Sequence, residues 1–217
     1  NVLKKIILVY DAANDIFELS KNNQYARQVI DSWAQAEWFT NKKSLPKEIK
    51  CLVFKVKGET NTDDLSPAVH ATSRPDIPLH ALSMLEFKEE TGLNILEDLK
   101  SQNIQIAYVG DVVGTGSSRK SAINSLIWHI GENIPFVPNK KTGGIIIGGK
   151  IAPIFFNTAQ DSGALPIEAD VSNLNTGDLI KIKPYEGLIK KIDPLTKIEE
   201  KISQFDLKPS TITDEIQ

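Results

Sequence analysis

Cysteine is almost absent from this chain of 217 residues, which contains a single one, Cys51. One thiol cannot form a disulfide within the chain, and it cannot complete a zinc or iron–sulfur site built from cysteines. So little cysteine is consistent with a reducing compartment. No apolar run approaches the roughly 18 residues that cross a membrane. We therefore expect a cytoplasmic chain with no metal site of its own and no membrane partner.

A strong charge of one sign is also missing. The chain has 25 Lys and Arg against 28 Asp and Glu, a formal net charge of −3. The overall basic field of many nucleic-acid-binding proteins is therefore absent, although a local basic patch remains open. The chain opens at Asn1 without an initiator Met and enters a helical pattern at once. This start predicts a piece of a longer protein and not a signal peptide.

Two apolar stripes at helical spacing predict a helical hairpin at the N-terminus. The first stripe has members between positions 3 and 17, the second between 26 and 36, and polar residues 20–23 separate them. Two helices alone bury little surface, so we expect them to pack on helices outside this sequence. Packing on the rest of the chain is the alternative. Residues 41–50 are polar, contain Pro46 and are predicted to be a linker.

The pattern changes to mixed strands and helices after residue 50. Strands are predicted at 51–56, 104–109 and 145–147, and helices at 93–100, 118–130 and 151–162. Residues 179–183 and 188–192 form a predicted hairpin around the turn 184–187. Such a mixture indicates an α/β fold with β-rich edges. We assign it to residues 51–204, with the polar segment 205–217 as an exit linker.

The segment Gly114-Thr-Gly-Ser-Ser-Arg-Lys120 is the strongest candidate site. It places two serines and an arginine at the start of a predicted helix, where free N–H groups and the helix dipole favour an anion. An arginine there can grip a carboxylate with two hydrogen bonds. The segment matches neither a P-loop nor a dinucleotide fingerprint. From the residues alone, this segment is explained equally well as a site for a small carboxylated molecule and as a helix start capped by a serine.

Four longer segments extend this pattern, at residues 57–67, 73–81, 110–120 and 148–157. In their order and spacing they resemble the swivel domain of the B-type bacterial aconitases, the bifunctional aconitate hydratases and 2-methylisocitrate dehydratases. The hairpin at 2–39 resembles the end of the family's HEAT-like domain. The resemblance implies an α/β swivel domain preceded by a helical hairpin. Its divisions are 1–40 for the HEAT-like end, 41–50 for the linker, 51–204 for the swivel and 205–217 for the exit linker.

The resemblance also implies a reaction, the interconversion of citrate and isocitrate through cis-aconitate. Hydration of 2-methyl-cis-aconitate is a second reaction of the family. A base removes a proton from a carbon next to a carboxylate, and an iron of a 4Fe-4S cluster accepts the departing hydroxyl. In the family that cluster is held by domains that follow the swivel. We therefore expect the isolated chain to be inactive.

The resemblance assigns most of this chemistry to one loop. Ser117 matches the catalytic base, Ser118 a residue that contacts substrate, and Arg119 a residue that binds a substrate carboxylate. A serine hydroxyl is normally too weak an acid to ionise at neutral pH, so it needs a strong positive potential. The helix start and Arg119 can supply it. A helix cap remains the alternative for Ser118.

Two other segments contribute candidates by the same resemblance. Arg74 matches a second arginine that binds a carboxylate, and Pro75 after it predicts an extended backbone. An ordinary surface arginine is the alternative. Thr62 and Asp63 match residues near the site, where Asp63 could orient a catalytic group. Plain turn chemistry explains Asn-Thr-Asp-Asp equally well. No role is predicted for the histidines.

Three partners follow from the resemblance: a tricarboxylate substrate, the cluster-bearing domains of the same protein, and a second copy through the HEAT-like region. Family members are also thought to bind mRNA when the cluster is lost, which makes RNA binding or dimerisation the non-enzymatic alternative. The alternative enzyme is the small subunit of isopropylmalate isomerase, a free-standing swivel. The helical hairpin and the string Asn61-Thr-Asp-Asp64 argue against it.

Overall fold

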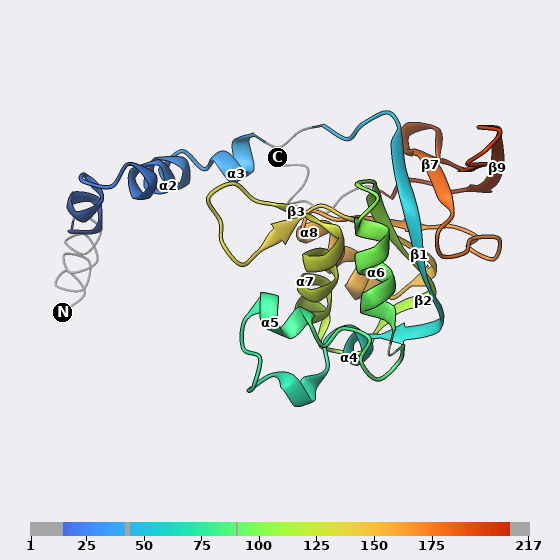
Figure 1. The fold of residues 1–217 in the computed structure, drawn as a ribbon, viewed down its shortest axis with the longest axis horizontal. Helices are drawn as coiled ribbons and strands as arrows, with labels where there is room; N and C mark the ends of the chain where they lie inside the picture. Colours follow the sequence, from blue (N-terminus) through green and yellow to red (C-terminus); the bar gives the residue numbers. More distant parts are fainter. Residues whose placement is uncertain (1–14, 42–43, 90, 209–217) are drawn as a thin grey trace. The chain divides into compact units, whose positions relative to one another are not determined.

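A seven-stranded sheet in the order β6-β5-β2-β1-β7-β8-β9 forms the centre of the fold (Figure 1). The structure is a computed structural model that describes residues 15–41, 44–89 and 91–208. Four strands run parallel, namely β1 (Ile49–Asn61), β2 (Gln105–Thr115), β5 (Ile145–Ile151) and β6 (Leu165–Glu168). Three antiparallel strands complete the sheet, namely β7 (Leu179–Lys183), β8 (Leu188–Ile192) and β9 (Glu199–Gln204). The predicted α/β class is confirmed.

Three longer helices cover one face of this sheet. They are α6 (Gly92–Lys100), α7 (Arg119–Ile130) and α8 (Pro153–Asp161), close to the ranges predicted from apolar spacing. The chain steps in one direction from β1 to β2, β5 and β6, and right-handed crossovers then place every connecting helix on the same face. The buried apolar side chains of all three helices accordingly share one core cluster with Leu52, Phe54 and Val56 of β1.

The alternate residues of β1 point to the opposite face, as the two-residue period of a strand requires. Cys51 and Val53 join a second core cluster there, together with side chains of β2, β5, β7 and β8. The β7–β8 hairpin turns through the short 3-10 helix η2 (Pro184–Glu186), as predicted. Phe205 is buried in this second cluster, although the prediction placed it at the start of the exit linker.

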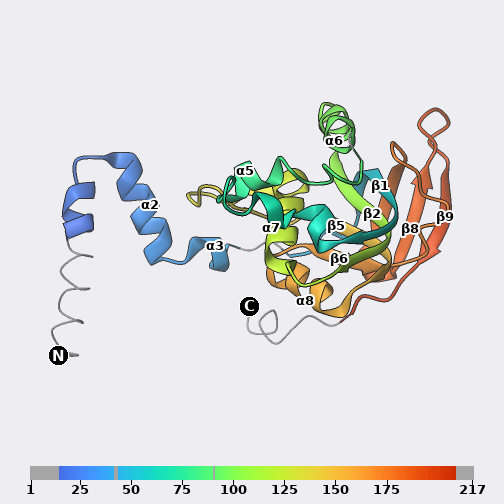
Figure 2. The same cartoon turned by 90° about the horizontal axis from the view of Figure 1, so that it is seen from below.

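Shorter elements connect the strands. Before β2 the chain forms α4 (Thr62–Leu65), the 3-10 helix η1 (Ala68–His70) and α5 (Ile77–Ala81). After α7 it forms a separate two-stranded sheet of β3 (Glu132–Asn133) and β4 (Lys141–Thr142). Figure 2 shows the sheet from a second direction, with β8 and β9 at its outer end. No helix in the described part of the chain is long and apolar enough to cross a membrane.

Contacts divide the chain into two units, which are described separately. Among the described residues, the first takes those from Asp15 to Ser44 together with Pro135–Pro138, and the second takes Leu45–Ile134 and those from Asn139 to Lys208. The first unit contains a helical stretch at 15–20, α2 (Gln24–Ala34) and α3 (Glu37–Thr40). Most of the first predicted helix, residues 1–14, lies outside the described residues. The predicted domain limits stay predictions.

Candidate active site

The candidate residues are positioned by the ends of two neighbouring parallel strands. β1 ends at Asn61 and β2 ends at Thr115, and these two residues are paired in the sheet. Helix α4 begins directly after β1, and α7 begins a few residues after β2. Ligands of α/β sheets bind outside the carboxyl ends of the strands, where such connections meet. The sheet register therefore brings Thr62 and Ser118, which are 56 positions apart in the sequence, to one edge.

Thr62 and Ser118 are joined by a hydrogen bond across this edge. The backbone N–H of Ser118 donates to Oγ1 of Thr62 at 3.2 Å. Thr62 is buried, so its hydroxyl is held inside the fold while it receives the bond. The loop can come this close because Gly116 precedes Ser118: a Cβ at Gly116 would lie 2.4 Å from Oγ1 of Thr62. Its φ of +104° is also strained for any residue with a side chain.

The start of α7 leaves Ser117 available for chemistry. Ser118 stands at the N-cap position, but its side chain makes no capping hydrogen bond, which removes the support for a cap role of that hydroxyl. Ser117 is exposed, and its hydroxyl has no hydrogen-bond partner within the described residues. Nη1 of Arg119 donates to the carbonyl of Gly116 at 3.3 Å, so the guanidinium lies against the loop that carries Ser117. Both the helix dipole and this cation favour negative charge here.

The loop is anchored to its surroundings on two sides. The hydroxyl of Thr115 donates to the carboxylate of Glu59 in the neighbouring strand at 2.5 Å. Gly114, with a φ of +79°, lies so close to α8 that a Cβ would meet the ring of Phe155 at 2.1 Å. These two anchors before Ser117, and the bond of the Ser118 N–H to Thr62 after it, hold its position without using its hydroxyl. Such preorganisation is what a catalytic group requires.

Helix α4 is a single turn closed by a capping box. The side chain of Asn61 accepts from the N–H groups of Asp63 and Asp64, and the carboxylate of Asp64 accepts from the N–H of Asn61 at 2.8 Å. The turn chemistry expected of Asn-Thr-Asp-Asp is thus present, and it supports Thr62. Asp63 is exposed, and its carboxylate has no partner among the described residues. The contact with the serine loop comes from Thr62, and a role for Asp63 stays a prediction.

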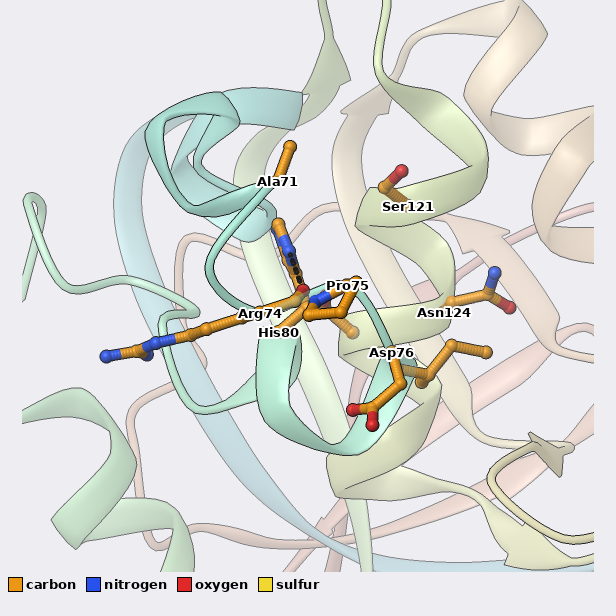
Figure 3. A pocket seen from close by; sticks show the side chains of 9 residues that line it. Ala71, Arg74, Pro75, Asp76, His80, Ser121 and Asn124 are labelled. Carbon is orange, nitrogen blue, oxygen red and sulfur yellow. Dashed lines mark hydrogen bonds between the residues drawn. The ribbon is translucent and has the colours of Figure 1, made fainter.

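Arg74 lies on the segment that faces α7 across a cavity of about 170 Å³. The cavity is lined by Ala71, Arg74, Pro75, Asp76, Ile77, His80, Ser121, Asn124 and Ser125. Ser118, Ser121 and Ser125 share one stripe of the helix, so the cavity continues the surface on which Ser118 lies. Figure 3 shows the side chain of Arg74 extending away from Ser121 and Asn124. The backbone of Arg74 is therefore near α7, whereas its guanidinium points outward.

The two candidate arginines have no acidic partner in the described part of the chain. The chain has a third arginine, Arg27 in α2, which pairs with Asp31 at 3.1 Å. An arginine that is half-buried without a counter-ion retains its capacity to bind a carboxylate. Arg74 and Arg119 are both of this kind, being intermediate in burial.

The structure adds one residue that sequence reasoning did not select. Nδ1 of His80 lies 3.1 Å from the carbonyl oxygen of Arg74, and Nε2 lies 2.8 Å from the hydroxyl of Ser66. Neither contact has a sequence signal, because residues 66, 74 and 80 share no motif spacing. The partners of a histidine in such a short helix can be identified only from the structure.

The fold does not offer ligands for an iron–sulfur cluster among its described residues. No group of three His, Cys, Asp or Glu side chains there could hold a metal ion. Burial raises the pKa of the Cys51 thiol to about 12, so this thiol is poorly suited to be a thiolate ligand. Cys51 also lies in the core of the sheet. The residues present therefore do not fit the cluster that the family resemblance implies.

The fold is that of a known dehydratase chain. A solved structure of 3-isopropylmalate dehydratase (leuD) from Methanocaldococcus jannaschii aligns with a TM-score of 0.51 and 20% identity. The alignment covers 78% of this chain and 87% of that one. At this level of identity the likeness establishes the α/β fold and nothing further.

Sequence comparison defines the family. The family model described as "Aconitate hydratase 2 N-terminus" matches residues 51–217, and "Aconitate B N-terminal domain" matches residues 1–39. Proteins named aconitate hydratase B are 64% identical in Synechocystis, 55% in Helicobacter pylori and 51% in Escherichia coli, each aligned over 99% of this chain. The chain belongs to the aconitate hydratase B family, as the resemblance predicted. It spans about a quarter of the length of these relatives, 24% to 26%.

Proposed function

We propose that this chain is the substrate-binding swivel portion of an aconitate hydratase, which interconverts citrate and isocitrate through cis-aconitate. Residues 51–204 form the swivel, and residues 1–40 form the end of a HEAT-like domain, joined by a linker at 41–50 and followed by an exit linker at 205–217. The observation that carries the proposal is the exposed Ser117 at the start of α7, on the loop against which Arg119 lies, with no acidic partner for that guanidinium among the described residues. Its relatives' shared name supports the same reaction.

The arginines bind the carboxylates of the substrate. A tricarboxylate needs several fixed positive charges, and Arg74 and Arg119 have no acidic partner among the described residues that would compete for them. The N–H groups at the start of α7 add a further electropositive surface, next to Arg119. Because a guanidinium can form two parallel hydrogen bonds with one carboxylate, it also fixes the orientation of the substrate.

Ser117 takes the proton. Its Oγ accepts the hydrogen from the carbon next to a substrate carboxylate, and the electron pair stays on the substrate. Ser117 acts in this step as an alkoxide, whose negative charge is stabilised by Arg119 and by the dipole of α7 until the transferred proton neutralises it. Ser118 contributes a substrate contact, since its hydroxyl makes no capping bond.

The 4Fe-4S cluster belongs to another part of the protein in this proposal. The described residues provide no ligand set for it, and the relatives are about four times as long as this chain. The isolated chain is therefore expected to bind a tricarboxylate without converting it. Formation of cis-aconitate by the pure, metal-free chain would contradict that expectation.

The test uses the full-length protein that carries this chain. Arg119→Lys and Arg74→Lys should each raise the KM for citrate by about tenfold or more, because a point charge cannot replace the guanidinium fork. Arg27→Lys is the matched control, since Arg27 is paired with Asp31 and belongs to the other unit of the chain. If both site variants behave like the control, the assignment of the carboxylate-binding residues is wrong.

The alternative functions and the other predictions from the resemblance have less support than this function. Relatives at 50% to 64% identity are all named aconitate hydratase B, which disfavours the small subunit of isopropylmalate isomerase. Copurification with a cluster-bearing large subunit would favour that alternative. Hydration of 2-methyl-cis-aconitate, a cytoplasmic location and self-association stay predictions from the resemblance. The net charge of −3 gives no support to mRNA binding.

A further inference from the structure

We propose that His80 is a positioning residue for Arg74, and that it ties Arg74 to the same one-turn helix that holds the serine loop. The inference rests on the proposed role of Arg74 in carboxylate binding. It concerns the contacts of the imidazole ring, which connect two parts of the site that are separate in sequence.

The hydrogen-bond roles of the ring follow from its partners. A carbonyl oxygen only accepts, so Nδ1 of His80 must carry the hydrogen that points to the carbonyl of Arg74 at 3.1 Å. The other nitrogen, Nε2, then accepts from the hydroxyl of Ser66 at 2.8 Å when the ring is neutral. Figure 3 shows the contact between the ring and the backbone of Arg74. One tautomer therefore satisfies both contacts.

The backbone of Arg74 is fixed on both sides of its α-carbon. Its N–H donates to the carbonyl of His70 at 2.9 Å, and its carbonyl accepts from His80. Pro75 follows and restricts the backbone further. Asp76 then caps α5, because its carboxylate accepts from the N–H of Leu79 at 2.9 Å. A constrained backbone with an unpaired guanidinium is the arrangement expected of a ligand-binding arginine.

The partner of His80 leads to the serine loop. Ser66 is buried at the C-terminal end of α4, and its N–H donates to the carbonyl of Thr62 at 2.9 Å. The hydroxyl of Thr62 receives the N–H of Ser118. A continuous path of hydrogen bonds thus runs from Arg74 through His80, Ser66 and α4 to the start of α7. The Arg74 segment and the start of α7, which both carry carboxylate-binding residues in the proposed function, are thus both hydrogen-bonded to α4.

Two substitutions of similar size separate the two ring contacts. In His80→Asn the side-chain amide nitrogen stands near the position of Nδ1 and can still donate to the carbonyl of Arg74. In His80→Gln the amide stands near Nε2 and can replace only the contact with Ser66. A merely structural role of His80 would give the two variants a similar Kd for citrate. Positioning of Arg74 instead predicts that the asparagine variant binds citrate nearly as well as the wild type, while the glutamine variant binds it more weakly.

The experiment measures the Kd for citrate by calorimetry, and kcat, in the full-length protein with its cluster. His80→Gln should raise the Kd about tenfold, which corresponds to about 1.4 kcal/mol, and change kcat less than about threefold. His80→Asn should recover most of that loss. In an Arg74→Ala background, His80→Gln should have no further effect on the Kd, because the group it positions is gone.

Each contrary result has a defined meaning. If Arg74→Ala raises the Kd but His80→Gln does not, the positioning role of His80 is wrong and the role of Arg74 stands. The same conclusion follows if His80→Gln still raises the Kd in the Arg74→Ala background. If Arg74→Ala leaves the Kd unchanged, the proposed function of Arg74 fails and takes this inference with it. Should His80→Gln not fold, Ser66→Ala tests the same path: a rise in Kd of about threefold supports it, and no rise overturns it.

Discussion

The buried hydroxyl of Thr62 accepts a hydrogen bond from the backbone N–H of Ser118 at 3.2 Å. This contact joins the first residue of α4 to the residue that precedes α7, and the pairing of Asn61 with Thr115 in the sheet makes it possible. One of the N–H groups that a helix leaves without an internal partner is thereby satisfied by a side chain from another element. Separately, the side chain of Ser118 makes no capping hydrogen bond, so both serine hydroxyls of the loop remain available to a ligand.

Replacing Thr62 should loosen the start of α7. Thr62→Val keeps the shape of the side chain but removes the acceptor, so the N–H of Ser118 loses a bond worth about 1 kcal/mol. Hydrogen exchange of that amide should become about fivefold faster, because local opening costs less. Thr62→Ser keeps the oxygen and is the control, and its exchange should stay close to that of the wild type. Equal protection in the valine and serine variants would show that this bond does not hold the loop.

Gly116 should tolerate no side chain. Gly116→Ala would bring a methyl group within 2.4 Å of Oγ1 of Thr62 and displace the loop that carries Ser117. Displacement of a catalytic group by about 1 Å can reduce turnover about 100-fold, and we expect kcat/KM of the full-length protein to fall by this order.

Gly177→Ala is the matched control for this substitution. Gly177 also has a positive φ, +90°, but nothing lies within 4 Å of the position of its Cβ. It should lose stability by about 1–2 kcal/mol through backbone strain and keep kcat/KM within about twofold. Similar losses of kcat/KM in both variants would attribute the effect of Gly116→Ala to strain alone.

His129 should make stability depend on pH below neutrality. Burial lowers the pKa of its imidazole from the usual 6.5, the positive charge of Lys100 lowers it further, and the hydrogen bond to the carbonyl of Ala81 opposes the shift. The unfolded chain thus binds the proton more readily than the folded one. The contribution of neutral His129 to the free energy of unfolding is therefore fully present above pH 6.5 and is lost as the pH falls toward the folded pKa. In His129→Gln, thermal unfolding should lose this part of its pH dependence. An unchanged pH profile would contradict it.

Cys51 should be unreactive while the protein is folded. Its thiol is buried, and burial raises its pKa to about 12, so almost no thiolate exists at pH 8. Iodoacetamide should modify Cys51 only after the chain is unfolded in guanidinium, as followed by mass spectrometry. Rapid modification of the native protein at pH 8 would show that the sheet opens around this residue.

Much of the fold could be predicted from sequence periodicity, because buried strands and amphipathic helices have clear patterns. The helices α6, α7 and α8 and the β7–β8 hairpin were predicted close to their observed limits. The strands β6 and β9 carry weaker signals: β6 contains Pro166, and β9 is largely polar. Both lie at the edges of the sheet, where neighbours on one side decide whether a short segment pairs.

The site was only partly accessible from sequence. The loop with Ser117 and Arg119 stands out because glycines, serines and an arginine precede an apolar helix. The contact of Thr62 with this loop depends on the sheet register, which local patterns do not contain. The same holds for His80, whose partners Ser66 and Arg74 are brought to it by two short helices and a turn.

Isotope exchange at the substrate tests the central claim most directly, since it reports proton transfer without the full reaction. In the full-length, cluster-loaded protein, NMR in deuterated water can follow exchange of the hydrogen on the carbon next to a carboxylate. Ser117→Ala should bind citrate with a Kd within about threefold of the wild type and exchange this hydrogen about 1,000-fold more slowly. Exchange at a rate near that of the wild type in a folded variant would mean that another group takes the proton.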